Sequence, residues 1–303
     1  MKDNLLVGHS GCKLLLLKKK GSDHIDGVRK FSKDSEYNKR LKSQADKQHN
    51  FNSKIFKSPD VNSSGEIDGI YYFDMQYIRG MTLSKSVKTM TPREIEKITD
   101  NVISYIEENI SSSDTMNKLD KHELVHKKLS NIEKSLTISR RNKLEQTFCY
   151  LNNFKWNNLE SSPCHGDLTF ENILIGSDGI YLIDFLDTFI DTWVSDISKM
   201  LQDLIVGWSF REKIISNQIT ETEKIKMHFF KDVFCIKINN RIRKTDLWEQ
   251  IHAYLLLDLL RIIPYTNDKK IYEYIERSLF KLTTEVKKGN FYEYINNSMR
   301  WPL

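Results

Sequence analysis

The sequence has little cysteine, and its four cysteines form no recognisable pattern. Cys12, Cys149, Cys164 and Cys235 show neither the paired spacing of a metal site nor the framework of a disulfide-rich secreted protein. The longest apolar run near the start, Leu14–Leu17, is too short for a signal peptide or a membrane span. We therefore expect a cytoplasmic protein with reduced thiols and no membrane span.

A strong charge imbalance, internal repeats and low-complexity segments are also missing. Lys and Arg number 46 against 41 Asp and Glu, and the resulting net charge of +5 is spread along the chain. Nucleic-acid-binding proteins usually gather basic residues on one face, so we expect a solvated surface and no nucleic-acid partner. A chain of 303 residues is long enough for two lobes, each with its own core.

One stretch in the middle of the chain, residues 163–196, carries the clearest functional pattern. Asp167 precedes Asn172 by five residues. Two apolar runs joined by a turn rich in Gly and Asp then separate Asn172 from Asp184. Such a pair of runs predicts a β-hairpin, which would bring Asn172 and Asp184 close together at its open end.

These three side chains suit one kind of chemistry. The amide oxygen of Asn172 and the carboxylate of Asp184 could share a magnesium ion, which prefers oxygen ligands and keeps positions for water and phosphate. Asp167 would then orient or deprotonate an attacking hydroxyl. Each residue taken singly could cap a helix or close a turn. Their order and spacing together indicate a kinase-like site.

The order also resembles the catalytic loop of protein kinases, although Gly166 stands where those enzymes carry arginine. His-Gly-Asp-Leu at 165–168, followed by Ile-Asp-Phe at 183–185, resembles the aminoglycoside phosphotransferase and choline kinase family of small-molecule kinases. This resemblance implies a two-lobed, protein-kinase-like α+β fold with a small antiparallel-sheet N-lobe and a larger, mostly helical C-lobe. It also implies ATP as co-substrate and Mg²⁺ as cofactor.

The resemblance assigns phosphate-binding roles near the start of the chain. A glycine turn with Gly8, Ser10 and Gly11 would cover the phosphates, although such a turn is also typical of a plain hairpin. Lys30, two places after a valine on the expected third strand, would hold the α- and β-phosphates. Lys13 is the reserve candidate for this role.

The helix expected over residues 36–51 departs from the kinase pattern. Kinases supply a glutamate here to pair with the strand lysine. This sequence offers Gln44 and Gln48 on the inward face and Asp46 towards the polar side. Three alternatives follow: a glutamine amide orients Lys30, Asp46 reaches it, or it is held in some other way.

A strand over residues 70–75 leads into Met-Gln-Tyr-Ile-Arg-Gly, which resembles the interlobe segment of the same family. Backbone groups of Gln76 and Ile78 would meet the purine edge, with Met75 lining the pocket behind it. The preceding polar residues, 62–69, are typical of a turn. The expected lobes are therefore a nucleotide-binding lobe at 1–82 and a catalytic and acceptor-binding lobe at 83–303.

The second lobe is predicted to be mainly helical. Thr91-Pro92-Arg93-Glu94 is typical of a helix start with a capping box. Apolar periodicity predicts further helices, which cover residues 117–136, 138–152, 221–241, 245–263 and 269–287.

Soon after Asp184 the next helix begins, near Trp193, and no activation segment of the protein-kinase type intervenes. This disfavours a peptide substrate. Asp196 resembles a family aspartate that braces the catalytic loop through backbone hydrogen bonds. Asp187 fits a metal or substrate contact and a turn carboxylate equally well.

We expect the acceptor to be a small molecule with a hydroxyl group, and its identity stays open. In the resembling family the acceptor site is built from C-terminal helices, where this chain carries several aromatics and Arg261. The glycine turn followed by Val-Arg-Lys resembles relatives linked to polysaccharide synthesis, which favours a sugar or polyol. A protein kinase and a catalytically silent nucleotide-binding module are the alternative functions. The oligomeric state is not predicted.

Overall fold

The structure, a computed structural model, describes most of the chain. The described residues are 5–7, 11–18, 21, 24–114, 119–244, 246–286, 290–298 and 301–302. Two residues of the predicted glycine turn, Gly8 and Ser10, lie outside them.

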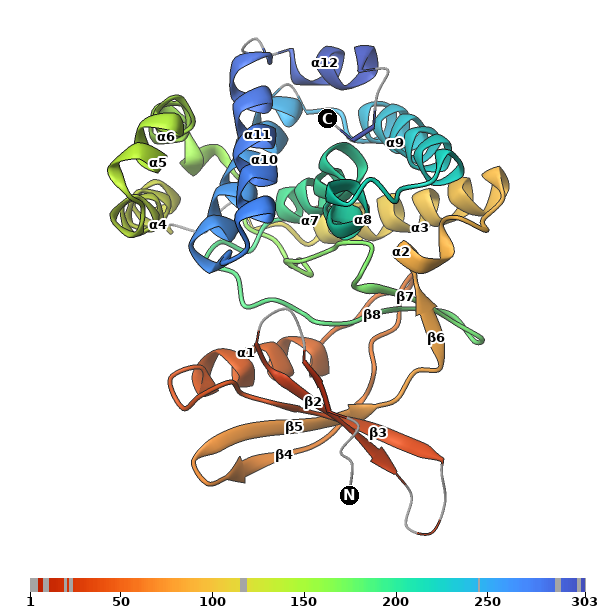
Figure 1. The fold of residues 1–303 in the computed structure, drawn as a ribbon. Helices are drawn as coiled ribbons and strands as arrows, with labels where there is room; N and C mark the ends of the chain where they lie inside the picture. Colours follow the sequence, from red (N-terminus) through yellow and green to blue (C-terminus); the bar gives the residue numbers. More distant parts are fainter. Residues whose placement is uncertain are drawn as a thin grey trace. The chain divides into compact units, whose positions relative to one another are not determined.

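Contacts between Cα atoms divide the chain into two compact units (Figure 1). The first unit comprises Met1–Leu83 and Asn172–Thr188, and the second comprises Ser84–Glu171 and Phe189–Leu303. The sequence predicted a single division after residue 82. The contact-based units group the later segment 172–188 with the first one, and the predicted lobe boundary stays a prediction.

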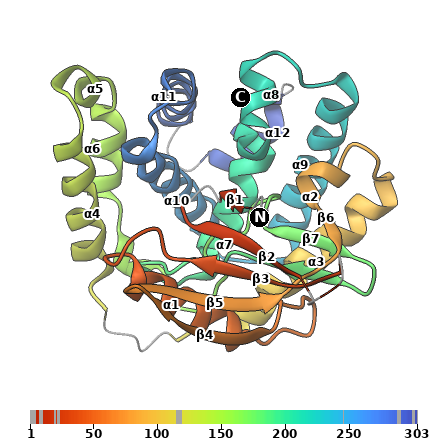
Figure 2. The ribbon, with the colours of Figure 1, turned by 60° about the horizontal axis from the view of Figure 1, so that its bottom comes forward.

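The first unit contains a five-stranded antiparallel sheet and one helix, α1 (Asn38–His49). The strands follow the spatial order β1 (Leu5–Val7), β2 (Lys13–Lys18), β3 (Ile25–Phe31), β5 (Ile70–Gln76) and β4 (Val61–Ile67). Figure 2 shows the helix lying along one face of this sheet. Leu41 and Ala45 of α1 pack with Cys12 and with Tyr71, Phe73 and Met75 of β5, and these six buried residues form a hydrophobic core cluster in the unit. Burying this apolar surface fixes the helix against the sheet.

Strand β4 was not predicted, because its residues are polar and rich in serine. It pairs with β5 from Val61 to Ile67 as an edge strand, with most of its side chains exposed. The expected turn is confined to Asp68 and Gly69, which both have positive φ. An edge strand contributes backbone hydrogen bonds without needing an apolar face, so its composition gave no strand signal.

A second sheet joins two distant segments within the first unit. Strand β6 (Gly80–Thr82) pairs with β7 (Ile173–Gly176), and β7 pairs with β8 (Ile180–Leu182) as the predicted hairpin. A Cβ atom at residue 80 would collide with the backbone carbonyl of Ile175, so this pairing requires glycine.

The described part of the second unit is mainly helical, and its non-helical segments include residues 159–171, which carry the loop with Asp167. Its helices are α2 (Leu83–Ser86), α3 (Pro92–Ser111), α4 (Lys121–Ser135), α5 (Ile138–Lys143), α6 (Glu145–Asn153), α7 (Trp193–Leu201), α8 (Arg211–Ile215), α9 (Glu221–Arg241), α10 (Leu247–Ile262), α11 (Lys269–Thr284) and α12 (Phe291–Asn297). Helix α10 contacts α6, α7, α11 and α12 and is buried along most of its length.

Local sequence explains how several of these helices begin and end. Thr91 and Glu94 form the predicted capping box of α3. The single helix expected over residues 138–152 is divided at Leu144, which is buried between α5 and α6. Helix α7 continues into a π-helical turn at Gln202–Val206, a feature frequently found at functional sites.

Among the described residues, no helix combines the length and the hydropathy that crossing a membrane would require.

Candidate functional site

Lys30 lies on β3 and points towards α1 within the first unit. Its side chain is buried, and its Nζ lies 3.0 Å from Asp184 Oδ1 and 3.3 Å from Gln44 Oε1. Burial lowers the pKa of Lys30, but the adjacent Asp184 carboxylate outweighs it, so the pKa lies above its ordinary value. Lys30 is therefore a charged ammonium group inside the protein.

Gln44 occupies the place where the kinase pattern would have a glutamate. Its amide nitrogen donates a hydrogen bond to the hydroxyl of Tyr37 at 3.1 Å, which directs its amide oxygen towards Lys30. Of the three alternatives open from the sequence, the glutamine amide is the one the structure shows, together with Asp184. The other inward glutamine, Gln48, donates to Pro59 O and to Met75 Sδ instead.

Asp184 follows β8 and is exposed, whereas the preceding Ile183 is partly buried and the following Phe185 is buried. Its φ of 60° is unusual for a residue with a side chain and costs on the order of 1–3 kcal/mol. Phe185 next to it is buried and packs on Phe51, with ring centroids 5.0 Å apart. This anchor holds the backbone of the strained residue in place, with one carboxylate oxygen beside Lys30.

Asn172 precedes β7 and lies beside Asp184 at the mouth of the hairpin. Ile183 N donates to Asn172 O at 3.0 Å, which fixes the two ends of the hairpin against each other. An amide and a carboxylate offer the oxygen ligands that Mg²⁺ prefers, and Mg²⁺ commonly takes only one or two protein ligands beside phosphates and water. The residues present therefore fit a magnesium ion. No cluster of three or more His, Cys, Asp or Glu with metal-site geometry occurs among the described residues.

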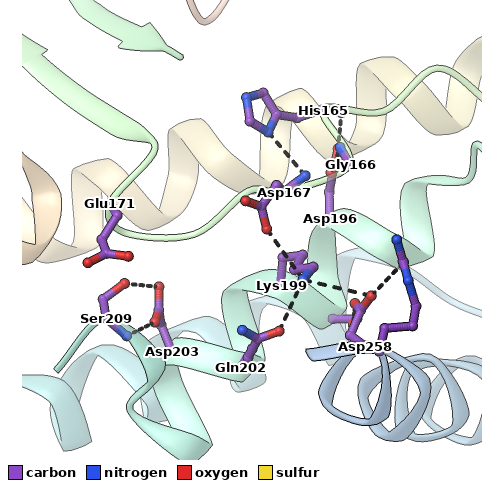
Figure 3. A network of polar contacts seen from close by, with 12 residues as sticks. His165, Gly166, Asp167, Glu171, Asp196, Lys199, Gln202, Asp203, Ser209 and Asp258 are labelled. Carbon is purple, nitrogen blue, oxygen red and sulfur yellow. Dashed lines mark hydrogen bonds and ion pairs between the residues drawn. The ribbon is translucent and has the colours of Figure 1, made fainter. Parts of the chain in front are cut away.

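The loop at residues 165–170 lies in the second unit and carries Asp167. Asp196, near the start of α7, accepts hydrogen bonds from the backbone N–H groups of His165 and Gly166, both at 2.8 Å (Figure 3). Gly166 has a φ of 86°, a conformation that favours glycine. Asp196 thus makes the bracing contacts that the sequence resemblance implied.

Two further residues of the same helical stretch hold this loop. Asp203 accepts a hydrogen bond from Phe170 N at 2.6 Å and two more from Ser209, through its backbone N–H and its hydroxyl. Burial raises the pKa of Asp203 to about 7, in spite of these hydrogen bonds. Lys199 lies between Asp196 and Asp203 on the helix, and its Nζ is 3.3 Å from Asp167 Oδ1.

The remaining predicted nucleotide-binding residues all lie in the first unit. Met75 is buried in its core, and Gln76 ends β5 with its N–H donated to Asp60 O at 2.9 Å. Gly11 has a φ of 78° and precedes β2. Ile78 lies between β5 and β6. The assignment of these four residues to purine and phosphate binding stays a prediction.

Sequence reasoning missed Lys199, Asp203 and Asp258. The sequence did contain one indication, since Asp, Lys and Ser interrupt the otherwise apolar run at Trp193–Leu201. The structure shows that every residue of this helix is buried. Their spacing from Asp196 places Lys199 and Asp203 on one helix face. Asp187, left open from the sequence, accepts a hydrogen bond from Ser43 Oγ at 3.1 Å within the first unit.

A groove of about 810 Å³ in the second unit involves none of these residues. It is lined by α8, α11 and α12, and its charged residues include Lys270, Arg277 and Glu285. We do not assign it to the site, because the predicted catalytic groups lie elsewhere.

No protein-family model and no curated protein sequence matches this chain. Solved structures do match it along nearly its whole length. The complex of a thermostable mutant of aminoglycoside phosphotransferase APH(4)-Ia with AMP-PNP and hygromycin B aligns with a TM-score of 0.63 and 12% identity, over 93% of each chain.

Two other structures extend this similarity. The gentamicin complex of APH(2")-IIa aligns with a TM-score of 0.55 and 17% identity, over 96% of this chain and 94% of that one. A putative fructosamine-3-kinase from Haemophilus somnus aligns with a TM-score of 0.56 and 12% identity, over 94% of this chain and 91% of that one. The resemblance predicted from the sequence is confirmed at the level of the fold: this chain has the protein-kinase-like α+β fold of the aminoglycoside phosphotransferases.

Proposed function

We propose that the protein is an ATP- and Mg²⁺-dependent kinase that transfers the γ-phosphoryl group to a hydroxyl of a small molecule. The observation that carries this proposal is a pair of residue groups, one in each unit. One holds a buried lysine beside Asp184, and the other holds Asp167 on a braced loop. The similar structures support it, since one was solved with AMP-PNP and hygromycin B and another is a putative fructosamine-3-kinase.

Each group has a defined role in the proposal. Lys30 binds phosphate oxygens, and Asn172 and Asp184 hold Mg²⁺, which neutralises charge that develops on the transferred phosphoryl group. Asp167 accepts a hydrogen bond from the attacking hydroxyl and orients it. Asp167 and Asn172 are five residues apart in the chain, so the backbone itself limits their separation to at most about 18 Å.

The nucleotide end of the site is proposed to include the segment after β5. Gln76 N already donates to a backbone carbonyl. The purine would therefore contact the carbonyl oxygen of Gln76 and the N–H of Ile78, with Met75 behind it. The glycine turn at Gly8, Ser10 and Gly11 would close over the phosphates.

We propose a sugar or polyol as the acceptor, and a cytoplasmic location. Hygromycin B and gentamicin, bound in similar structures, carry sugar rings with hydroxyl groups, as does a fructosamine. A metabolite of cell-surface polysaccharide synthesis agrees with this chemistry.

The test is phosphoryl transfer from γ-labelled ATP with Mg²⁺ to a panel of sugars, polyols, amino alcohols, aminoglycosides and protein mixtures. We expect a labelled small molecule from the wild-type chain and none from the matched Asp167→Asn variant. Labelled protein in place of a labelled small molecule would contradict the acceptor class. Binding of MgATP without transfer to any acceptor would indicate a catalytically silent nucleotide-binding module.

A further inference from the structure

We propose that Lys199 is a positioning residue that holds the carboxylate of Asp167 in place for phosphoryl transfer, and that Asp258 holds Lys199. The inference rests on the proposed function for its kinetic consequence. Its structural part concerns three side chains of the second unit, drawn in Figure 3.

The first step is the contact between Lys199 and Asp167. Lys199 Nζ lies 3.3 Å from Asp167 Oδ1 and 3.2 Å from Gln202 Oε1. The lysine side chain is only 9% exposed, whereas that of Asp167 is 33% exposed. The ammonium group therefore approaches Asp167 from the protein interior, and the carboxylate remains accessible to an acceptor.

The second step is the support behind Lys199. Asp258 on α10 lies with its Oδ1 3.8 Å from Lys199 Nζ, and this carboxylate is 1% exposed. Its Oδ2 accepts a hydrogen bond from Ser198 Oγ at 2.6 Å, and its Oδ1 accepts one from Arg261 at 3.2 Å. With both oxygens engaged, Asp258 has a fixed orientation and so gives Lys199 a fixed anionic partner.

The third step is the position of Lys199 on its helix. Asp196, Lys199 and Asp203 follow one another at spacings of three and four residues, which places them on one helix face. Asp196 holds the backbone at the start of the loop, Asp203 holds it at Phe170, and Lys199 contacts the side chain between them. The loop is therefore fixed at three points by one helical stretch.

A positioning role follows from the chemistry of a carboxylate. Its two oxygens offer about four lone-pair sites, so an ion pair at Oδ1 leaves capacity to accept the acceptor hydroxyl. The ion pair restricts the orientation of the carboxylate, and a displacement of about 1 Å in a reacting group can cost on the order of 10²-fold in rate. A purely structural Lys199 would instead serve only to pair Asp258 and join α7 to α10.

The experiment compares Lys199→Met with Lys199→Arg, using MgATP and the acceptor that the panel identifies. Methionine keeps most of the length of the side chain without its charge, and the variant leaves in place Arg261, which pairs with the buried Asp258. We expect Lys199→Met to lower kcat by roughly 10–100-fold with the KM for MgATP within about twofold. Lys199→Arg should recover at least part of that loss.

Three further measurements make the result decisive. Asp258→Asn, which keeps the shape of the side chain and removes the charge behind Lys199, should lower kcat by a smaller factor than Lys199→Met. Crystal structures of the wild type and Lys199→Met should show Asp167 in one rotamer in the former and displaced or in two conformers in the latter. Thermal unfolding of each variant checks that the fold is kept.

The outcomes separate this inference from the proposed function. A wild-type chain that phosphorylates no acceptor contradicts the proposed function, and the crystal structures still test the positioning of Asp167. If the wild type is active and Lys199→Met keeps its kcat, Lys199 does not position Asp167. Equal losses in both Lys199 variants, in proportion to a fall in Tm and with Asp167 unmoved, would also overturn the inference and assign Lys199 a structural role.

Discussion

In each unit a buried lysine contacts a glutamine and an aspartate with a proposed function, and the two arrangements differ in one respect. Lys30 contacts Gln44 and Asp184 in the first unit. Lys199 contacts Gln202 and Asp167 in the second and has an additional buried carboxylate, Asp258, at 3.8 Å. The described residues offer Lys30 no second carboxylate within ion-pair distance.

This difference fits two different tasks. A buried ammonium group is costly unless it is paired, so a lysine with one anionic partner must find another when that partner is taken by a ligand. In the proposed function Asp184 would help to hold Mg²⁺, and phosphate oxygens would become the new partner of Lys30. Lys199 keeps Asp258 throughout, and so it can hold Asp167 without depending on a ligand.

The largest expected effect, on turnover, comes from replacing Asp167, the aspartate beside Lys199. Asp167→Asn should lower turnover by roughly 10²–10⁴-fold, because the amide is a poor base and a weaker acceptor for the hydroxyl. The Kd for MgATP should change little, since the variant leaves the first unit intact. Steady-state kinetics and nucleotide titration measure the two quantities, and normal turnover would remove the proposed role of Asp167.

The corresponding change beside Lys30 should affect the nucleotide instead. Asp184→Ala removes a proposed magnesium ligand and the anionic partner of Lys30, so the Mg²⁺-dependent part of ATP binding should weaken by about 10- to 100-fold. A calorimetric titration with ATP at several Mg²⁺ concentrations measures this change. A titration that matches the wild type would rule out the metal-binding role.

Acidification should lower the free energy of unfolding of the second unit through a histidine on α10, the helix that carries Asp258. Burial lowers the pKa of His252 to about 4, and its ring lies between Tyr150 OH and Leu282 O. As the pH falls below 6.5, His252 binds a proton in the unfolded chain but stays neutral in the folded chain. The contribution of His252 to the free energy of unfolding is therefore fully present above pH 6.5 and is lost as the pH falls to about 4. The loss attributable to His252 is about 3 kcal/mol.

Denaturant unfolding of the wild type and His252→Gln across this range tests the effect. The variant should lose less stability on acidification, and the difference between the two proteins is the relevant quantity. Asp203, whose pKa is about 7, acts in the opposite direction over the same range and cancels in the comparison. Parallel pH profiles for both proteins would show that His252 is not responsible.

The smallest expected effect comes from making the two lysine sites alike. Gln44→Glu would give Lys30 a permanent carboxylate partner that competes with phosphate, and we expect the Kd for MgATP to rise by about three- to tenfold, or about 1 kcal/mol. Gln202→Glu is the matched control, because Lys199 already has two carboxylates, and it should leave the Kd for MgATP unchanged. A Kd that falls in Gln44→Glu would contradict the comparison.

Local patterns predicted those parts of the structure that depend on neighbours in the chain. The capping box at Thr91 and the hairpin between Asn172 and Asp184 were both predictable, since a few consecutive residues determine them. Strand β4 was not predictable, because it forms by pairing with β5 and its own composition does not favour a strand.

The contacts of the two buried lysines were predictable only in part. The family resemblance predicted Lys30 as the phosphate-binding lysine. That Gln44 and not Asp46 contacts Lys30 depends on how α1 packs on the sheet. The pairing of Lys199 with Asp258 joins residues on α7 and α10, and no local pattern links them. Long-range contacts of this kind arise from packing, which a single sequence does not display.

The close approach of Gly80 to Ile175 has a consequence for motion. It joins the segment after the proposed purine-binding residues directly to the hairpin that carries Asn172 and Asp184. The proposed purine-binding segment and the two proposed metal ligands are therefore linked through one sheet, so a shift of the strand at Gly80 would also move Asn172 and Asp184. A bulkier residue at position 80 would uncouple them, so that a nucleotide could still dock while its phosphates met a displaced ion.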